Sequence, residues 1–240
     1  MQNYNFDLDI VSRIQATRGT TRLMDRLDPS TTAHVVIDLQ AGFMREGALL
    51  EVPDARGIVP AVNAISKALR AAGGLVAFTR FAFLKDEPAY WNVFYSRFLD
   101  GKRAAAQMEA FSPGSPDLEL WAGLDVGKAD LVADKTRYSA FTHGTCDLDA
   151  ALRARGIKTL IITGTMTNCC CESTARDAMQ LGYDVIFASD ATATLTAAEQ
   201  KATLMNMAML FAELATAAEI VAVLRAQVAA KSTIPASAEA

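Results

Sequence analysis

Short apolar runs rich in β-branched residues alternate with segments of helical spacing, and this alternation constrains the fold more than any other feature of the chain. The expected strands are residues 34–38, 75–79, 130–133, 159–163, 184–188 and a short run near 213–216. The expected helices are residues 58–72, 148–155, 168–181, 197–210 and 217–229. Continuous apolar strands alternating with helices are typical of a parallel sheet that is covered on both faces. We therefore predict an α/β fold with a doubly wound, mostly parallel sheet of about six strands and helices on both faces.

The regular pattern starts after a polar lead-in and stops before a short tail. We divide the chain into an N-terminal arm at residues 1–30, one α/β domain at 31–230 and a frayed tail at 231–240. One short helix is expected within the arm, near residues 9–17. The arm has too little apolar content to pack alone, so we expect it to lie across a neighbouring subunit. Residues 81–128 are rich in aromatic side chains but show no clear period.

Charge and hydropathy narrow the choice of partners. The formal net charge is −4 at pH 7 and no block of Lys and Arg stands out, so nothing favours a nucleic acid or an anionic membrane as partner. No apolar stretch has the length needed to span a bilayer, and the chain start lacks the apolar centre of a secretory signal. We expect a cytoplasmic protein whose partner is a small molecule.

The four cysteines are Cys146 and the consecutive Cys169, Cys170 and Cys171. Consecutive cysteines do not make a disulfide framework, and three adjacent side chains cannot converge on one metal ion. The remaining interpretations are a buried cluster of small residues and a reactive thiol. Residues 163–174 join a strand to a helix, and the first turn of a helix favours thiolate over thiol. This segment alone supports the two interpretations about equally.

Two more polar residues fall at the same edge of the predicted sheet. In doubly wound folds, ligands bind beyond the carboxyl ends of the strands. Asp38 ends the first strand, and Lys135 follows the strand at 130–133. Taken singly, Asp38 is equally well explained as a turn or helix-cap residue, and Lys135 is better explained as a solvated surface residue. Taken together with a cysteine, they supply a nucleophile, a base and a charged group that controls the base.

Three segments resemble motifs of the isochorismatase-like hydrolases, and they occur in the family's order. Asp38-Leu-Gln-Ala-Gly-Phe43 is similar to the opening D-x-Q-x-x-F, and residues 135–141 resemble K-x-x-x-S-x-F. Residues 164–177 resemble the nucleophile loop G-x-x-T-[ND]-x-C-V-x-x-T-x-x-D. The chain departs from the family where Ala41-Gly42 replaces a frequent Asn-Asp pair and where Cys171 replaces the usual valine. The resemblance covers roughly residues 30–220.

The resemblance implies a role for each of these residues. Cys170 would be the nucleophile, Asp38 the general acid and base, and Lys135 the third member of a catalytic triad. A non-proline cis peptide bond would precede Met166, and the backbone N–H groups of Met166 and Cys170 would form the oxyanion hole. The implied activity is that of a cysteine amidohydrolase, which cleaves a C–N bond of a small linear amide or ureide through a thioester on Cys170.

The resemblance also bears on subfamily, cofactor and assembly. The nucleophile loop looks most like that of the ureidoacrylate amidohydrolase and related carbamoyl- or ureide-cleaving branch. No cofactor is expected. The nicotinamidase branch holds a metal with several histidines after the first strand, but no histidine lies between His34 and His143, so no metal site is expected. The family further implies a homo-oligomer, either a dimer or a tetramer.

Several residues near the motifs are candidates for substrate binding. For Arg80, a structural ion pair is the better explanation. For residues 90–95, packing in the core or at an interface is a better explanation than a lid over the substrate. His34 lies in an apolar strand and is expected to be structural. Two other functions stay open: a vinyl-ether hydrolase that uses Asp38 and Lys135 without a covalent step, and a thiol sensor or binding protein. The substrate-binding candidates are Gln40, Phe43, Arg80, Trp91, Tyr138 and Asn168.

Overall fold

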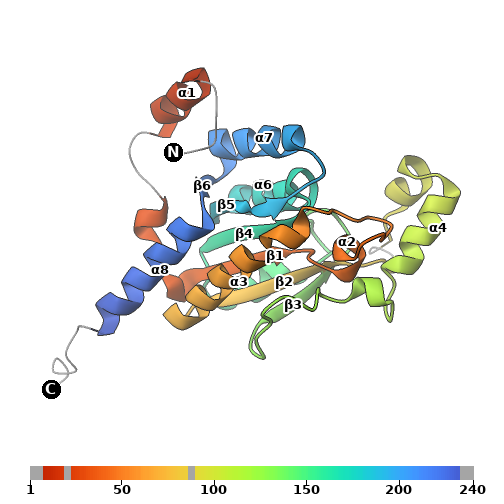
Figure 1. Cartoon of the computed structure of the whole chain (residues 1–240), viewed down its shortest axis with the longest axis horizontal. Helices are drawn as coiled ribbons and strands as arrows, with labels where there is room; N and C mark the ends of the chain where they lie inside the picture. The colour runs from red at the N-terminus through yellow and green to blue at the C-terminus, as the bar shows by residue number, and fades with distance from the viewer. Residues whose placement is uncertain (1–7, 19–22, 86–89, 233–240) are drawn as a thin grey trace.

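A six-stranded sheet forms the centre of the molecule (Figure 1). The computed structural model describes residues 8–18, 23–85 and 90–232. The strand order is β3-β2-β1-β4-β5-β6, and every neighbouring pair is parallel. The predicted α/β class is therefore confirmed. The strands are β1 (Thr32–Ile37), β2 (Leu75–Phe81), β3 (Leu131–Lys135), β4 (Thr159–Thr165), β5 (Asp184–Ala193) and β6 (Glu213–Ala215).

Helices cover both faces of this sheet, each over its own apolar core. α3 (Ala55–Ala72) and α8 (Ala217–Ser232) pack over the face that contains Val36 of β1. Val35 of β1 faces the opposite core, because successive side chains of a strand alternate between the faces. The helices on that second face are α5 (Leu148–Arg153), α6 (Glu172–Gln180) and α7 (Ala197–Asn206).

Two of the predicted helices contain a wider, π-helical turn. The helix expected at 168–181 starts with the π turn η5 (Thr167–Cys171) and continues as α6. The helix expected at 197–210 runs as α7 and ends in the π turn η6 (Met207–Phe211). π turns within helices are frequent at functional sites, and η5 carries the run of three cysteines.

The segments without a clear period form short helices beyond one end of the sheet (Figure 1). Asp100 caps α4 by accepting hydrogen bonds from the backbone N–H groups of Lys102 and Arg103. α2 follows β1 directly, so these helices lie past the carboxyl ends of the strands. The elements are α2 (Ala41–Met44), the π turn η3 (Phe94–Phe98), α4 (Gly101–Ala110) and the 3₁₀ turn η4 (Pro116–Leu118).

The helix expected within the arm is α1 (Leu8–Arg18), and two 3₁₀ turns, η1 (Leu23–Arg26) and η2 (Pro29–Thr31), lead into β1. Ile14 of α1 is buried, and the Arg18 guanidinium donates to the backbone oxygen of Met207 in the same chain. Packing of the arm across a neighbouring subunit stays a prediction, and the expected tail lies largely outside the described residues. No described helix is both long enough and apolar enough to cross a bilayer.

Candidate active site

The three predicted catalytic residues are carried to one edge of the sheet. Asp38 follows β1, and Cys170 lies in η5, directly after β4. The sequence suggests that Lys135 lies in a turn after its strand. Lys135 is instead the last residue of β3, because β3 extends two residues further than predicted. Since all strands are parallel, their carboxyl ends meet at the same edge.

The backbone of Asp38 has a left-handed conformation, with φ of 50°, and it is the one non-glycine residue with a positive φ in the described part of the chain. Such conformations cost energy for residues with a side chain and cluster at functional sites. Two backbone hydrogen bonds hold this one: Asp38 N–H donates to Thr79 O at 3.2 Å, and Gln40 N–H donates to Asp38 O at 2.8 Å. Asp38 itself is fully buried.

Lys135 forms an ion pair with Asp38 in which both side chains are completely buried. The Lys135 Nζ atom lies 2.6 Å from Asp38 Oδ2 and donates to the backbone oxygen of Arg137 at 3.0 Å. Its ammonium group also lies over the Phe81 ring, 5.3 Å from the ring centroid. Burial alone would lower the pKa of Lys135, but the Asp38 carboxylate and the Cys170 sulfur raise that pKa above its ordinary value. Lys135 therefore stays a cation at neutral pH.

Cys170 is buried beside this ion pair, and Cys169 is partly exposed. A hydrogen bond between the Cys169 and Cys170 sulfurs, reinforced by burial, raises the pKa of the Cys170 thiol, and the same bond lowers the pKa of Cys169. Asp38 further raises the pKa of Cys170 and Lys135 lowers it, so both charges act on its sulfur. Cys170 thus rests as a thiol and requires a base to become a nucleophile.

The loop between β4 and the cysteines has an unusual backbone. The bond between Thr165 and Met166 is cis, as the family resemblance implied. The N–H groups of Cys169 and Cys171 both donate to Met166 O at 3.1 Å, which closes the loop. Gly164, with φ of 113°, packs so closely against β1 that a Cβ atom there would lie 2.6 Å from Ile37 N. The assignment of an oxyanion hole to the Met166 and Cys170 N–H groups stays a prediction.

Gln40 and Phe43, two of the substrate-binding candidates, are engaged inside the protein. The Gln40 amide donates to the backbone oxygens of Phe81 and Leu118 at 3.1 and 3.0 Å, and its Oε1 accepts from Phe81 N–H at 2.7 Å. Neither proton of this amide is left for a ligand. The Phe43 ring is buried against the Phe111 ring, 5.0 Å away between centroids. Both side chains are therefore engaged within the protein, and contact of either one with a substrate stays a prediction.

The Ala41-Gly42 pair, which departs from the family pattern, has a packing explanation. Gly42 lies in α2 under the Phe111 ring, and a Cβ atom at this position would lie 2.7 Å from Phe111 Cζ. A larger residue would have to displace the ring, so the close packing of α2 against the end of α4 explains the glycine at this position.

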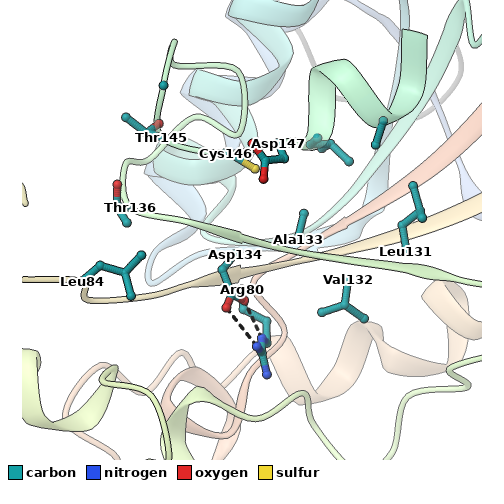
Figure 2. A pocket seen from close by; sticks show the side chains of 13 residues that line it. Arg80, Leu84, Leu131, Val132, Ala133, Asp134, Thr136, Thr145, Cys146 and Asp147 are labelled. Atoms are coloured by element: carbon teal, nitrogen blue, oxygen red, sulfur yellow. Dashed lines mark hydrogen bonds and ion pairs between the residues drawn. The ribbon is translucent and has the colours of Figure 1, made fainter. Parts of the chain in front are cut away.

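Arg80 is held by an ion pair, the alternative that the sequence had favoured. Its guanidinium donates to both carboxylate oxygens of Asp134, at 2.7 and 3.0 Å, as Figure 2 shows. Arg80 and Thr79 are successive residues of β2 and point to opposite faces of the sheet, so Arg80 points away from the face on which Thr79 contacts Asp38.

Tyr138 and Trp91 lie in contact with each other. Their ring centroids are 4.7 Å apart in an edge-to-face arrangement, and Phe94 packs against both. Burial raises the pKa of the Tyr138 phenol, and the Cys169 and Cys170 sulfurs raise it further, so the phenol stands close to these thiols. Within residues 90–95, Phe94 and Tyr95 are buried in the core, whereas Trp91 is half-exposed.

Asn168, the last substrate-binding candidate, is oriented by a threonine. Thr194 Oγ1 donates to Asn168 Oδ1 at 2.6 Å, which directs the amide NH₂ group of Asn168 away from Thr194. Asn168 is partly exposed and precedes Cys170 by two residues. Contact of Asn168, Trp91 or Tyr138 with a substrate stays a prediction.

Sequence reasoning missed Thr79, whose hydroxyl contacts the Asp38 carboxylate. Its Oγ1 donates to Asp38 Oδ1 at 2.7 Å. One signal in the sequence could have indicated it. Thr79 is a polar residue at the end of a predicted apolar strand, in the same position as Asp38 in the preceding predicted strand.

A cavity of about 700 Å³ opens beside the outer edge of β3 (Figure 2). It is lined by Arg80, Asp134, Thr136 and Cys146, among others, and not by Asp38, Lys135 or Cys170. In the described part of the chain, no group of three or more His, Cys, Asp or Glu side chains is arranged to hold a metal ion.

Comparisons with known proteins agree with this arrangement. A family model described as the isochorismatase domain matches residues 32–219. The ureidoacrylate amidohydrolase RutB of Variovorax paradoxus is 35% identical over 208 residues, which cover 81% of this chain and 82% of the relative. RutB of Agrobacterium fabrum is 34% identical, with 79% and 88% covered. A cysteine hydrolase structure from Pseudomonas syringae pv. phaseolicola has a TM-score of 0.75 and 32% identity, with 84% of this chain and 95% of that chain covered. The chain therefore belongs to the isochorismatase-like cysteine hydrolase superfamily.

Proposed function

We propose that this hydrolase cleaves a C–N bond of a small linear amide or ureide, with Cys170 as nucleophile, Asp38 as general acid and base, and Lys135 as the cation that controls charge. The observation that carries this proposal is the fully buried ion pair between Lys135 and Asp38, whose charges both act on the Cys170 sulfur. The RutB relatives, which are named as ureidoacrylate amidohydrolases, favour a ureide over a simple amide.

The ion pair is better explained by chemistry than by stability. Removing a carboxylate and an ammonium group from water costs several kcal/mol for each ion, and a well-packed apolar pair often stabilises a fold equally well. Asp38 is in addition held in a left-handed backbone conformation. A buried charge pair on a strained residue, next to a buried thiol, is the arrangement expected where a base must act on a nucleophile.

The reaction would proceed in two halves. Asp38 takes the proton of the Cys170 thiol, and the thiolate attacks the substrate carbonyl carbon while the oxyanion accepts hydrogen bonds from the Met166 and Cys170 N–H groups. Each such donor is typically worth about 3–4 kcal/mol of transition-state stabilisation. The C–N bond then breaks, and Asp38 returns its proton to the departing nitrogen, which leaves a thioester on Cys170.

The second half hydrolyses this thioester. Asp38, again ionised, takes a proton from a water molecule, and the resulting hydroxide attacks the thioester carbonyl. The C–S bond breaks, the sulfur regains a proton from Asp38, and an acid product leaves. Lys135 keeps its proton throughout and lies 2.6 Å from Asp38 Oδ2, where it stabilises the ionised carboxylate that each half requires.

The test is a product-release screen with ureidoacrylate, N-carbamoyl amino acids and simple amides. The Cys170→Ala and Asp38→Asn variants should lose turnover, and quenched wild-type enzyme should carry a covalent adduct on the tryptic peptide that contains Cys170. Cys146→Ser is the matched control and should keep turnover, because Cys146 lines the separate cavity beside β3.

Each contrary result points to a different function. Full turnover by Cys170→Ala would refute the covalent scheme and favour a vinyl-ether hydrolase that uses Asp38 and Lys135. Reversible oxidation of the thiols without turnover of any compound in the panel would favour a thiol sensor.

A further inference from the structure

The two oxygens of the Asp38 carboxylate have different surroundings. Oδ1 accepts a hydrogen bond from Thr79 Oγ1 at 2.7 Å. Oδ2 lies 2.6 Å from Lys135 Nζ, and no other donor reaches it in the described part of the chain. One oxygen is therefore held by a neutral hydroxyl, and the other faces the ammonium group of Lys135.

Thr79 holds the backbone of Asp38 as well as its side chain. Asp38 N–H donates to Thr79 O at 3.2 Å and also approaches Thr79 Oγ1 at 3.3 Å. Thr79 is fully buried in β2, which lies between β1, the strand that Asp38 follows, and β3, the strand that ends at Lys135. The Thr79 hydroxyl thus contacts both the backbone and the carboxylate of Asp38.

We propose that Thr79 is a positioning residue of the active site, whose hydroxyl holds Asp38 Oδ1 so that Oδ2 is presented to Lys135 and Cys170. This role rests on the proposed function, because it requires Asp38 to act as the base. A valine in place of Thr79 would fill nearly the same space but would leave Oδ1 as a buried acceptor without a donor. The carboxylate would then be free to rotate toward Lys135, and Oδ2 would no longer be fixed.

The titratable groups on which the Asp38 charge acts would be unchanged by such a substitution. They are Lys135 from β3, the three thiols Cys169, Cys170 and Cys171 from η5, and the Cys146 thiol of the separate cavity, where Asp38 is the smallest contribution to the raised pKa. Loss of the Thr79 hydroxyl would therefore change the position of the Asp38 carboxylate while these neighbours stay in place.

The experiment compares Thr79→Val, which removes the hydroxyl, with Thr79→Ser, which keeps it. Thr79→Val should lower kcat by about 10- to 100-fold with little change in KM, because misplacement of a reacting group by about 1 Å has an effect of that size. Thr79→Ser should stay close to wild type in kcat and in KM. The matched control is Thr32→Val, which also removes a buried threonine hydroxyl but lies at the opposite end of the neighbouring strand β1. The lost hydroxyl donates to Asp28 O, far from the site, so kcat/KM should stay unchanged.

A second readout does not need turnover. The rate at which iodoacetamide alkylates Cys170, followed against pH and located by peptide fragmentation, should fall in Thr79→Val and not in Thr79→Ser. If Thr79→Val does not fold, Thr79→Ala takes its place in both assays. A wild-type kcat and a wild-type alkylation rate in the hydroxyl-free variant would overturn the positioning role, and so would equal losses in the serine and valine variants. By contrast, turnover that survives in Cys170→Ala would count against the proposed function.

Discussion

The buried imidazole of His34 should make the fold lose stability as the pH falls below neutrality. His34 lies in β1 with no exposed surface, and its ring nitrogens contact Ser66 Oγ at 3.0 Å and Thr163 Oγ1 at 2.8 Å. Burial, with a smaller contribution from the Arg70 charge, lowers the pKa of His34 from 6.5 to about 3. The folded protein therefore keeps this ring neutral, whereas the unfolded chain protonates it near its ordinary pKa.

The sign and size of the effect follow from these two pKa values. Between them the unfolded state binds one more proton than the folded state, so the free energy of unfolding falls as the pH falls through this window. The contribution of His34 is fully present above pH 6.5, and it disappears as the pH approaches the folded pKa. From about pH 7.5 to about pH 5, this single group should remove ~2 kcal/mol of stability.

Urea unfolding at these two pH values tests the prediction with two variants. His34→Gln cannot titrate and should be less stable at the higher pH, but its stability should fall by ~2 kcal/mol less between the two conditions. His143→Gln is the matched control, since His143 is the other histidine of the chain and is exposed, and it should show the wild-type dependence. Equal losses in wild type and His34→Gln would refute the reasoning.

Two further predictions concern stability. Gly164→Ala should destabilise the fold by on the order of 4 kcal/mol, because the new Cβ atom would overlap the backbone of β1 at a position with positive φ. Gly57→Ala in α3 meets open space and should stabilise the fold by about 0.5–1 kcal/mol. Thermal unfolding that shifts both variants in the same direction would contradict this prediction. Asp130→Asn should cost ~2 kcal/mol in urea unfolding, because Arg70 donates two hydrogen bonds to a carboxylate whose side chain is only 4% exposed. Asp9→Asn, in an exposed ion pair, should change nothing measurable, and equal effects of the two substitutions would count against the role of burial.

The strands could be predicted because each is a run of apolar residues too short to be a helix and bounded by turn or helix signals. Most of the errors lie at their carboxyl ends, although β1 begins two residues earlier than predicted. β3 continues through Asp134 and Lys135, and β5 continues through Asp190 to Ala193, because pairing with a neighbouring strand extends a strand into polar sequence. Local composition carries no information about a partner strand that is far away in the chain.

The helices beyond the sheet could not be predicted for a similar reason. α4 contains alanines and charged residues without an apolar stripe, and only Ala104 and Gln107 of this helix are buried. Its position is set by contacts of neighbouring segments, such as Phe111 between Phe43 and Phe81. No hydrophobic periodicity in the sequence indicates these contacts.

The motif residues of the candidate site could be found from the sequence, but their supports could not. Asp38, Lys135 and Cys170 each follow or end a strand, and parallel strands align their ends, so a common edge could be inferred. That Thr79 supports Asp38 depends on β2 pairing beside β1, and that Gln40 binds Phe81 and Leu118 depends on the course of the chain after β2. Neither follows from residue type or spacing.

Lys135 lies in β3, a strand at one edge of the sheet, and this position should decide how the enzyme loses activity on heating. β3 pairs only with β2 among the described strands, and its Val132 and Asp134 side chains are exposed. Peripheral strands of this kind detach locally at a lower free energy than the whole domain requires to melt. Detachment of β3 would withdraw the ammonium group while leaving the centre of the sheet intact, so a warmed sample should become inert while its circular dichroism still looks native.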